Sequence, residues 1–229
     1  MTGIARIDHL VVAADTLAQG VAWCEATLGV KPGPGGEHPL MGTHNRLLRI
    51  ATVDHPRAYF EIIAADPAMP VAPHGRRRWY DLDDAALRAS IRDQGPRLVH
   101  WVAQVPDMAA AVAALQRLGI DRGHVLAVSR MTPRGLLQWE ITVRDDGQRL
   151  FDGCLPSLIA WGDVHPAAAM PESGVTLHRL AIRHPHADAL RDALRVLGID
   201  GVEVTEGAPD LCATLHGPRA TVRLESGGV

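Results

Sequence analysis

Three histidines recur at matching positions along the chain, each inside a short apolar run: His9, His100 and His178. A glycine follows each of them at nearly the same distance, 20, 19 and 20 residues later: Gly29, Gly119 and Gly198. Imidazole is a ligand of first-row metals such as zinc and iron. It is also common as a buried core side chain with a hydrogen-bond partner. The spacing leaves both interpretations open.

The residues around each histidine predict the same local elements three times. The apolar, β-branched run predicts a strand, and the segment between histidine and glycine has the spacing of an amphipathic helix that ends at the glycine. Further strands are then predicted in all three places: 45–51 and 58–64; 125–130, 136–143 and 155–161; 202–205, 211–215 and 220–224. The order is β-α-β-β-β, although in the first repeat the glycine- and proline-rich segment 31–41 reads as a loop.

These repeats predict an α+β fold in which two paired βαβββ units form a cleft or half-barrel. The first unit spans residues 1–66 and the second spans 96–162, and the two together make one domain. A third, smaller βαβββ-like unit spans 174–226. The connections 66–95 and 163–174 read as links between units. In the third unit, strict alternation puts Arg179 and Arg183 on the solvent-exposed face of the strand, so His178 is expected to face the apolar side.

Composition excludes several classes of protein. The chain has 229 residues, of which 47% are hydrophobic and 21% charged, with a formal net charge of −3. This is typical of a globular protein and gives no reason to expect a nucleic-acid partner. No apolar stretch approaches the roughly 20 residues that span a bilayer, and the three cysteines fit reduced thiols. No glycine motif predicts a nucleotide cofactor. We therefore expect a cytoplasmic protein without nucleic-acid or membrane partners.

Several stretches of the sequence resemble a known family. They are IDHLVVAADTL near the start, GGEHPLMGTHNRLL at 35–48, YFEII at 59–63 and LPSLIAWG at 155–162. With the repeated unit, they make the chain similar to the vicinal oxygen chelate superfamily, and more closely to the bacterial glyoxalase-like domain family. The resemblance implies a cleft between paired units, in which a divalent metal often binds adjacent substrate oxygens.

The resemblance also implies a candidate metal site. Its ligand positions match His9 and His100 on the first strands of the two units and Glu61 on the last strand of the first. Two imidazoles and a carboxylate suit Zn, Ni, Mn or Fe. Glu61 is then also the catalytic candidate for proton transfer. Aligning YFEII with SLIAW puts Ala160 at the fourth position, and alanine cannot bind a metal. Glu140 on the preceding strand is an alternative that the resemblance does not support.

Other residues are candidates for substrate binding. The family-like loop before a strand offers Thr43, His44 and Asn45 to substrate oxygens, although a glycine turn with a polar cap explains these three residues as well. His38 in the same loop is a further candidate, either as a base near the substrate or as an exposed loop histidine, and the exposed position is favoured. Arg130 has the planar fork that binds a carboxylate, or it is one more surface arginine. Trp139 would line an apolar pocket or belong to the core.

The leading hypothesis is a small-molecule enzyme of glyoxalase-like type, with a divalent metal that stabilises an oxyanion. Isomerase, lyase and dioxygenase chemistry all remain open. The alternative is a metal-free protein that binds or sequesters a small molecule in the same cleft. A homodimer is a further possibility.

Overall fold

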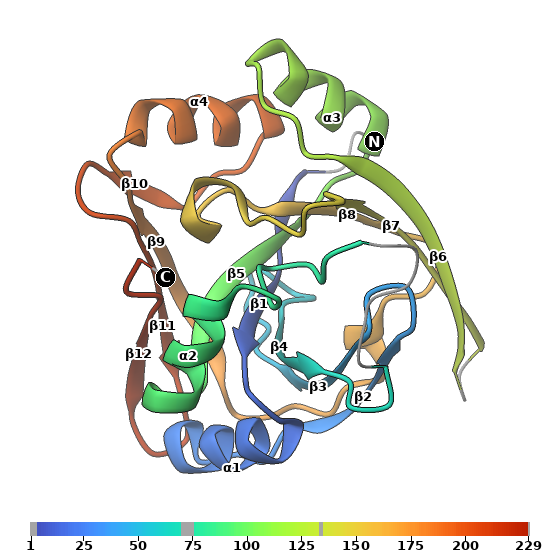
Figure 1. Cartoon of the computed structure of the whole chain (residues 1–229), viewed down its shortest axis with the longest axis vertical. Coiled ribbons are helices and arrows are strands. Elements are labelled where there is room, and N and C mark those ends of the chain that lie inside the picture. The colour runs from blue at the N-terminus through green and yellow to red at the C-terminus, as the bar shows by residue number, and fades with distance from the viewer. Residues whose placement is uncertain (1–3, 70–75, 133–134, 229) are drawn as a thin grey trace.

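In the computed structural model, which describes residues 4–69, 76–132 and 135–228, two β-sheets and four helices form one mixed α/β molecule. The larger sheet has eight strands and curls into a half-barrel, and the smaller sheet has four strands (Figure 1). The predicted fold class is confirmed. No helix in these residue ranges is long and apolar enough to cross a membrane.

The repeated βαβββ order is present three times. The first repeat consists of β1 (Arg6–Ala13), α1 (Leu17–Leu28), β2 (Gly33–His38), β3 (Thr43–Arg49) and β4 (Tyr59–Ala65). The second consists of β5 (Arg97–Gln104), α3 (Met108–Arg117), β6 (His124–Thr132), β7 (Gly135–Val143) and β8 (Ser157–Trp161). The third consists of β9 (Thr176–Arg183), α4 (Ala187–Leu197), β10 (Glu203–Thr205), β11 (Asp210–His216) and β12 (Thr221–Glu225). Helix α2 (Ala85–Gln94) and the 3₁₀ turn Pro166–Ala169 lie between repeats, and a second 3₁₀ turn, Leu150–Gly153, lies between β7 and β8 of the second repeat.

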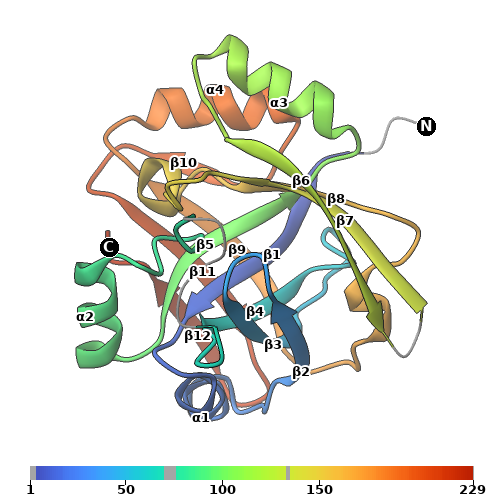
Figure 2. The same ribbon diagram turned by 45° about the vertical axis from the view of Figure 1, so that its right-hand side comes forward.

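The first two repeats build the eight-stranded sheet together. Its order is β2-β3-β4-β1-β5-β8-β7-β6, so the two histidine-bearing strands β1 and β5 are antiparallel neighbours at its centre. The third repeat forms the other sheet, in the order β10-β9-β11-β12. Figure 2 shows the β6–β7 hairpin extending along one side of the curled sheet. The boundaries predicted for the units, 1–66, 96–162 and 174–226, stay predictions.

The larger sheet separates two apolar cores. On its convex side, Leu10, Phe60 and Trp101 pack with α1, α3 and the buried face of the four-stranded sheet. On its concave side, Val11 and Ile63 pack with residues of the segment that precedes α2 and with α2 itself. Alternation along each central strand therefore sends every second side chain into the half-barrel. The structure therefore shows which face of β1 and β4 lines the cavity. The sequence did not predict this, because the residues of these strands are apolar on both faces.

The glycines that mark the repeat do so for a backbone reason. Gly29, Gly119 and Gly198 have φ angles of 73°, 75° and 69°. L-residues rarely adopt this left-handed conformation, which glycine takes without steric cost, and here it ends or follows α1, α3 and α4. The nearly constant number of residues from histidine to glycine therefore corresponds to the rest of one strand and the helix that follows it.

The sequence predicted a loop for segment 31–41, but part of this segment is a strand. It contains β2, which pairs antiparallel with β3 at the edge of the sheet. A Cβ on Gly35 would meet the Asn45 side-chain oxygen at 2.1 Å, and one on Gly36 would meet Arg130 Nη1 at 1.4 Å. The glycines are needed because two polar side chains pass close to this strand. An edge position also tolerates Pro34.

The connection 66–95 is also more than a link. It forms α2 and, before it, a turn in which Tyr80 and Asp81 both have left-handed φ angles, 59° and 57°. Trp79 and Tyr80 are buried in the concave core. Part of this connection, residues 70–75, lies outside the described ranges.

The predicted orientation of His178 is wrong. It is exposed and stacks on His216, with ring centroids 4.4 Å apart. The register between β9 and β11 shifts at this point, where Thr214 faces Arg179 and the next residue, Leu215, faces Leu177. The irregularity leaves His178 unpaired and breaks the two-residue period on which the expectation rested.

Candidate active site

The concave face of the larger sheet surrounds a small cavity of about 40 Å³. His9 from β1, Asn45 from β3 and Tyr59 and Glu61 from β4 line it on one side. Alternation explains the set, because Tyr59, Glu61 and Ile63 occupy one face of β4. Side chains from the segment before α2 and from β6–β8 line the remaining sides: Trp79, Tyr80, Arg130, Trp139, Ile159 and Trp161 among them.

A chain of buried polar contacts runs through this wall. His9 Nδ1 lies 2.7 Å from Asp8 Oδ1, and His9 Nε2 lies 3.6 Å from Glu61 Oε2. Asp8 Oδ2 also accepts hydrogen bonds from Trp161 Nε1 (2.9 Å) and His165 Nε2 (3.0 Å). The Asp8 carboxylate therefore fixes the ring of His9 and leaves Nε2 facing Glu61. The three side chains form an Asp–His–Glu series inside the protein.

Asn45 connects Glu61 to the loop at β2. Asn45 Oδ1 accepts a hydrogen bond from the Gly36 N–H (2.7 Å), which turns Nδ2 toward Glu61 Oε1, 2.5 Å away. Nδ2 also lies 3.4 Å from His38 Nε2. His38 Nδ1 in turn contacts Thr43 Oγ1 (3.1 Å), which accepts from Trp79 Nε1. One oxygen of Glu61 is thus held by an amide while the other faces His9.

The protonation of these groups follows from burial and from their partners. Burial raises the pKa of Glu61 above its usual range, although His9 and the Asn45 hydrogen bond oppose the shift. Burial also acts to raise the pKa of Asp8, but hydrogen bonds from His165 and His9 outweigh it and hold that pKa below its usual range. Burial lowers the pKa of His38 to about 3, with a contribution from the charge of Arg130. Asp8 is therefore an anion, His38 is neutral, and Glu61 is poised to exchange a proton.

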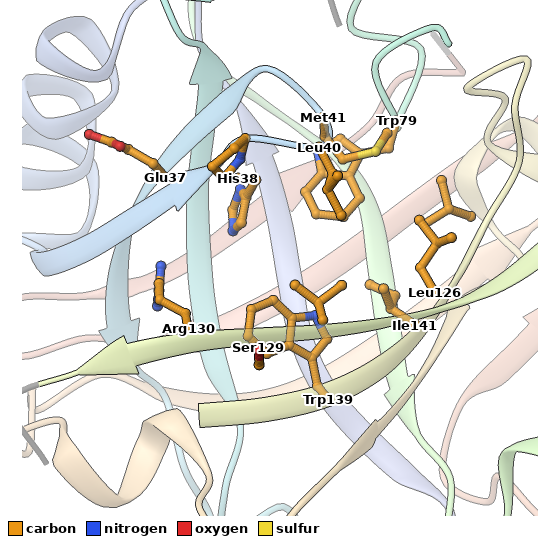
Figure 3. A pocket seen from close by; sticks show the side chains of 13 residues that line it. Glu37, His38, Leu40, Met41, Trp79, Leu126, Ser129, Arg130, Trp139 and Ile141 are labelled. Atoms are coloured by element: carbon orange, nitrogen blue, oxygen red, sulfur yellow. The ribbon is translucent and has the colours of Figure 1, made fainter. Parts of the chain in front are cut away.

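A larger pocket of about 300 Å³ adjoins the small cavity (Figure 3). His38, Trp79, Arg130, Trp139 and Ile141 line both, so the two spaces share part of their walls. Figure 3 shows Trp79 and His38 on one side of the pocket and Trp139 and Arg130 on the other. A third pocket, of about 660 Å³, is lined by residues of β2 and β3 and by residues in the range 164–173, and Arg130 lines it too.

His100 has surroundings unlike those of His9. It is fully buried, with Nδ1 3.1 Å from the Gly153 carbonyl oxygen. Its Nε2 accepts a hydrogen bond from the Ser157 N–H (3.1 Å) and lies 3.0 Å from Ser157 Oγ. Burial moves the pKa of His100 well below its usual range, so the ring is neutral. Both nitrogens are used within the fold.

Strand register corrects the alignment that placed Ala160 opposite Glu61. In the first repeat, the residue two after the histidine, Val11, pairs with Glu61. In the second repeat, the residue two after the histidine, Val102, pairs with Ser157. Ser157 therefore occupies the position that corresponds to Glu61. Ala160 packs against the convex core, on the other face of β8.

Comparison with protein families agrees with the fold and with the repeated unit. The model of the glyoxalase-like domain matches residues 7–198. The chain belongs to the glyoxalase-like domain family. The resemblance predicted from the sequence is confirmed. A search of curated proteins gives no match for this glyoxalase-like chain.

Solved structures of similar fold are distant in sequence. A hypothetical protein from Staphylococcus aureus is 15% identical with a TM-score of 0.57, over 97% of this chain and 85% of that one. Methylmalonyl-CoA epimerase in complex with methylmalonyl-CoA and NH4+ is 18% identical with a TM-score of 0.44, over 74% and 100%. The epimerase from Mycobacterium tuberculosis is 17% identical with a TM-score of 0.38, over 71% and 91%. The first of these supports the fold.

The described residues form no ready cluster of metal ligands at the positions that the family implies. Within the described ranges, no three His, Cys, Asp or Glu side chains are grouped so that they could hold a metal ion. His9 and Glu61 do lie together, but both nitrogens of His100 are engaged by Gly153 and Ser157. A metal-binding role for His9, His100 and Glu61 stays a prediction.

The predicted substrate-binding residues are spread over two faces. His38, Asn45, Arg130 and Trp139 all line the small cavity. Thr43 is fully buried behind it and holds His38 and Trp79 by hydrogen bonds. His44 lies between Thr43 and Asn45 on β3, so its side chain points to the opposite face. A direct substrate contact is not expected for His44, whereas the other roles stay predictions.

The main residue that sequence reasoning missed is Asp8. Alternation would put neighbouring residues Asp8 and His9 on opposite faces of a strand. The register between β1 and β5 shifts between Ile7 and His9, and this bulge brings the Asp8 carboxylate to the ring of His9. The acidic residue directly before the repeated histidine was the available signal. Trp79 and Tyr80 were missed because they lie in the connection taken as a link.

Proposed function

We propose that this glyoxalase-like protein is a small-molecule enzyme that moves a proton on a carbon atom next to a carbonyl group. The observation that carries the proposal is the buried Asp8–His9–Glu61 series at the wall of a cavity. Buried carboxyl groups with a raised pKa and a histidine partner are typical of general acid–base sites. The finer reaction class, isomerase or lyase, follows from the substrate.

In the proposed reaction Glu61 acts as the base. Its ionised carboxylate takes the proton as the C–H bond breaks, and the electron pair moves into an enediolate. The Asn45 amide and His9, which Asp8 orients, stabilise the carboxylate and hold it in place. Return of the proton to the neighbouring carbon, together with transfer of the hydroxyl proton to the former carbonyl oxygen, completes an isomerisation without any co-reactant. Tyr80 lines the cavity, and because burial raises its pKa well above the usual range, its hydroxyl stays a donor for the developing oxyanion.

The shape of the site favours a substrate with adjacent oxygens and an apolar part. The small cavity accommodates a few atoms beside Glu61, and the adjoining pocket offers the faces of Trp79 and Trp139. Aromatic walls of this kind bind planar or aliphatic groups. A compound with a carbonyl next to a hydroxyl or a carboxylate meets both requirements.

The test is hydrogen exchange in heavy water. A panel of 2-oxo and 2-hydroxy carbonyl compounds is incubated with the protein in D2O, and loss of the proton next to the carbonyl is followed by NMR. Wild type exchanges at least one compound, and Glu61→Gln lowers that rate by about 100-fold or more. Glu140→Gln, which removes an exposed carboxylate from β7, leaves the rate unchanged. Compounds that bind to the wild type without exchange would contradict the proposal.

A second function is favoured by one observation. The pocket of about 300 Å³ is lined mainly by apolar side chains, as in proteins that sequester small molecules without converting them. Binding that persists unchanged in Glu61→Gln, together with the absence of exchange in wild type, identifies a binding protein.

A further inference from the structure

Arg130 brings a positive charge to the candidate site, and this charge has no ion-pair partner in the described part of the chain. Its Nη1 atom is buried and has no hydrogen-bond partner among the described residues. A buried, unsatisfied cationic donor costs free energy, so such groups are normally paired with a protein acceptor or with a ligand. Arg130 lines the small cavity, the pocket of about 300 Å³ and the pocket of about 660 Å³. The side chain therefore borders all three spaces.

The fold keeps a place open for this guanidinium. It crosses from β6 to β2 and lies against Gly36, where a Cβ would meet Nη1 at 1.4 Å. The Gly36 N–H also positions Asn45, the residue that holds Glu61. Gly36 therefore helps to place both the Arg130 guanidinium and, through Asn45, the Glu61 carboxyl group at the same cavity.

The groups around Arg130 leave its charge available to a ligand. His38 is neutral, because burial and the charge of Arg130 lower its pKa to about 3. Glu61 feels the charge of Arg130 but is held by Asn45 and faces His9. Glu37 lines the neighbouring pocket with an exposed side chain, and among the ion pairs of the described residues none joins it to Arg130. An anion that enters the cavity is therefore attracted to Arg130 and repelled by the Asp8 and Glu61 end.

We propose that Arg130 binds a carboxylate of the substrate, and that Gly36 is the positioning residue for it. This inference rests on the proposed function and narrows its substrate to carbonyl compounds that bear a carboxylate. The planar guanidinium matches a carboxylate through two parallel hydrogen bonds. With the carboxylate on Arg130, the carbon next to the carbonyl lies on the side of Glu61, and an aromatic or aliphatic remainder lies between Trp79 and Trp139.

The experiment measures binding, so that it does not depend on turnover. Isothermal titration calorimetry compares phenylpyruvate with its primary amide and with phenyl phosphate. Wild type binds the carboxylate about 10- to 100-fold more tightly than the amide, the range expected for a charge-assisted hydrogen bond. Arg130→Gln reduces this preference to less than about twofold, and Arg130→Lys gives an intermediate value. Gly36→Ala, which displaces the guanidinium, also weakens binding of the carboxylate.

The controls separate this proposal from the one before it. Arg88→Gln removes an exposed arginine from α2 and leaves the preference unchanged. Thermal unfolding confirms that each variant is folded. Glu61→Gln retains the preference for the carboxylate even though exchange is lost. If wild type binds the amide as well as the carboxylate, prefers phenyl phosphate, or keeps its preference in Arg130→Gln, the proposal is overturned.

Discussion

The first two repeats place a histidine and a second polar side chain at the same two positions and use them differently. In the first repeat His9 Nε2 faces the carboxylate of Glu61 across 3.6 Å, beside a cavity. In the second repeat His100 Nε2 contacts the hydroxyl of Ser157 at 3.0 Å, and both rest inside the fold. The two repeats thus place polar side chains at equivalent positions, whereas the chemistry of each side chain depends on the groups around it.

The cations near the two sites differ in the same way. Arg122 donates to Ser157 Oγ at 2.6 Å and is buried behind His100, and its Nε and Nη1 atoms have no partner among the described residues. Arg130 faces cavities. The cluster around His100 is therefore enclosed by the fold, whereas the cluster around His9, which Arg130 reaches from β6 of the second repeat, borders cavities.

The largest expected difference is between the two histidines themselves. His9→Gln lowers the exchange rate that depends on Glu61 by about 100- to 10,000-fold, since it removes a group placed to support proton transfer. The matched change His100→Gln, at the same position of the repeat, leaves the rate of the folded protein within a few-fold of wild type. Both are measured by NMR in D2O. Equal losses in the two variants would mean that both repeats serve the reaction.

The free energy of unfolding is expected to change in the opposite order, with the larger loss for the His100 variant. His100→Ala removes the partner of the Ser157 N–H and of the Gly153 carbonyl oxygen and opens a cavity, at a cost of about 2–5 kcal/mol in the free energy of unfolding. His9→Ala costs less, because its ring lies at a cavity that water can enter. Urea denaturation at pH 7 gives both values. A greater loss for His9→Ala would reverse the assignment of structural and chemical roles.

The sequence predicted the architecture better than the site, for reasons visible in particular residues. The regular spacing from His9 to Gly29 marked one strand and one helix, and alternation put Tyr59 and Glu61 on one face of β4. The bulges at Asp8 and at His178 break that alternation, and a single sequence does not show where they occur. Likewise β2 forms because Gly35 and Gly36 accommodate Asn45 and Arg130, which are distant in the sequence.

A smaller effect is expected when the pH is lowered. His38 has a folded-state pKa of about 3, and that of His100 is also far below the unfolded value of about 6.5. The unfolded chain therefore binds more protons below pH 6.5, and the free energy of unfolding falls as the pH drops through this range. Each such histidine contributes up to about 1.4 kcal/mol per pH unit.

Glu61 acts in the opposite direction, since its raised pKa favours the folded state as the carboxyl becomes protonated. The difference between variants isolates the histidine contribution. Urea denaturation between pH 7 and pH 5 should give a shallower decline for His100→Gln than for wild type. Parallel curves would show that His100 is not held neutral in the folded protein.

The smallest effect is expected for Arg122, and it tests whether the second cluster has a ligand of its own. A buried arginine with one neutral hydrogen-bond partner gains little to offset its loss of hydration. Arg122→Met, which keeps most of the side-chain volume, should change the free energy of unfolding by no more than about 1 kcal/mol. It should also leave phenylpyruvate binding unchanged, in contrast to Arg130→Gln. Weaker binding in Arg122→Met would place an anion at both clusters on the concave face and remove the distinction between them.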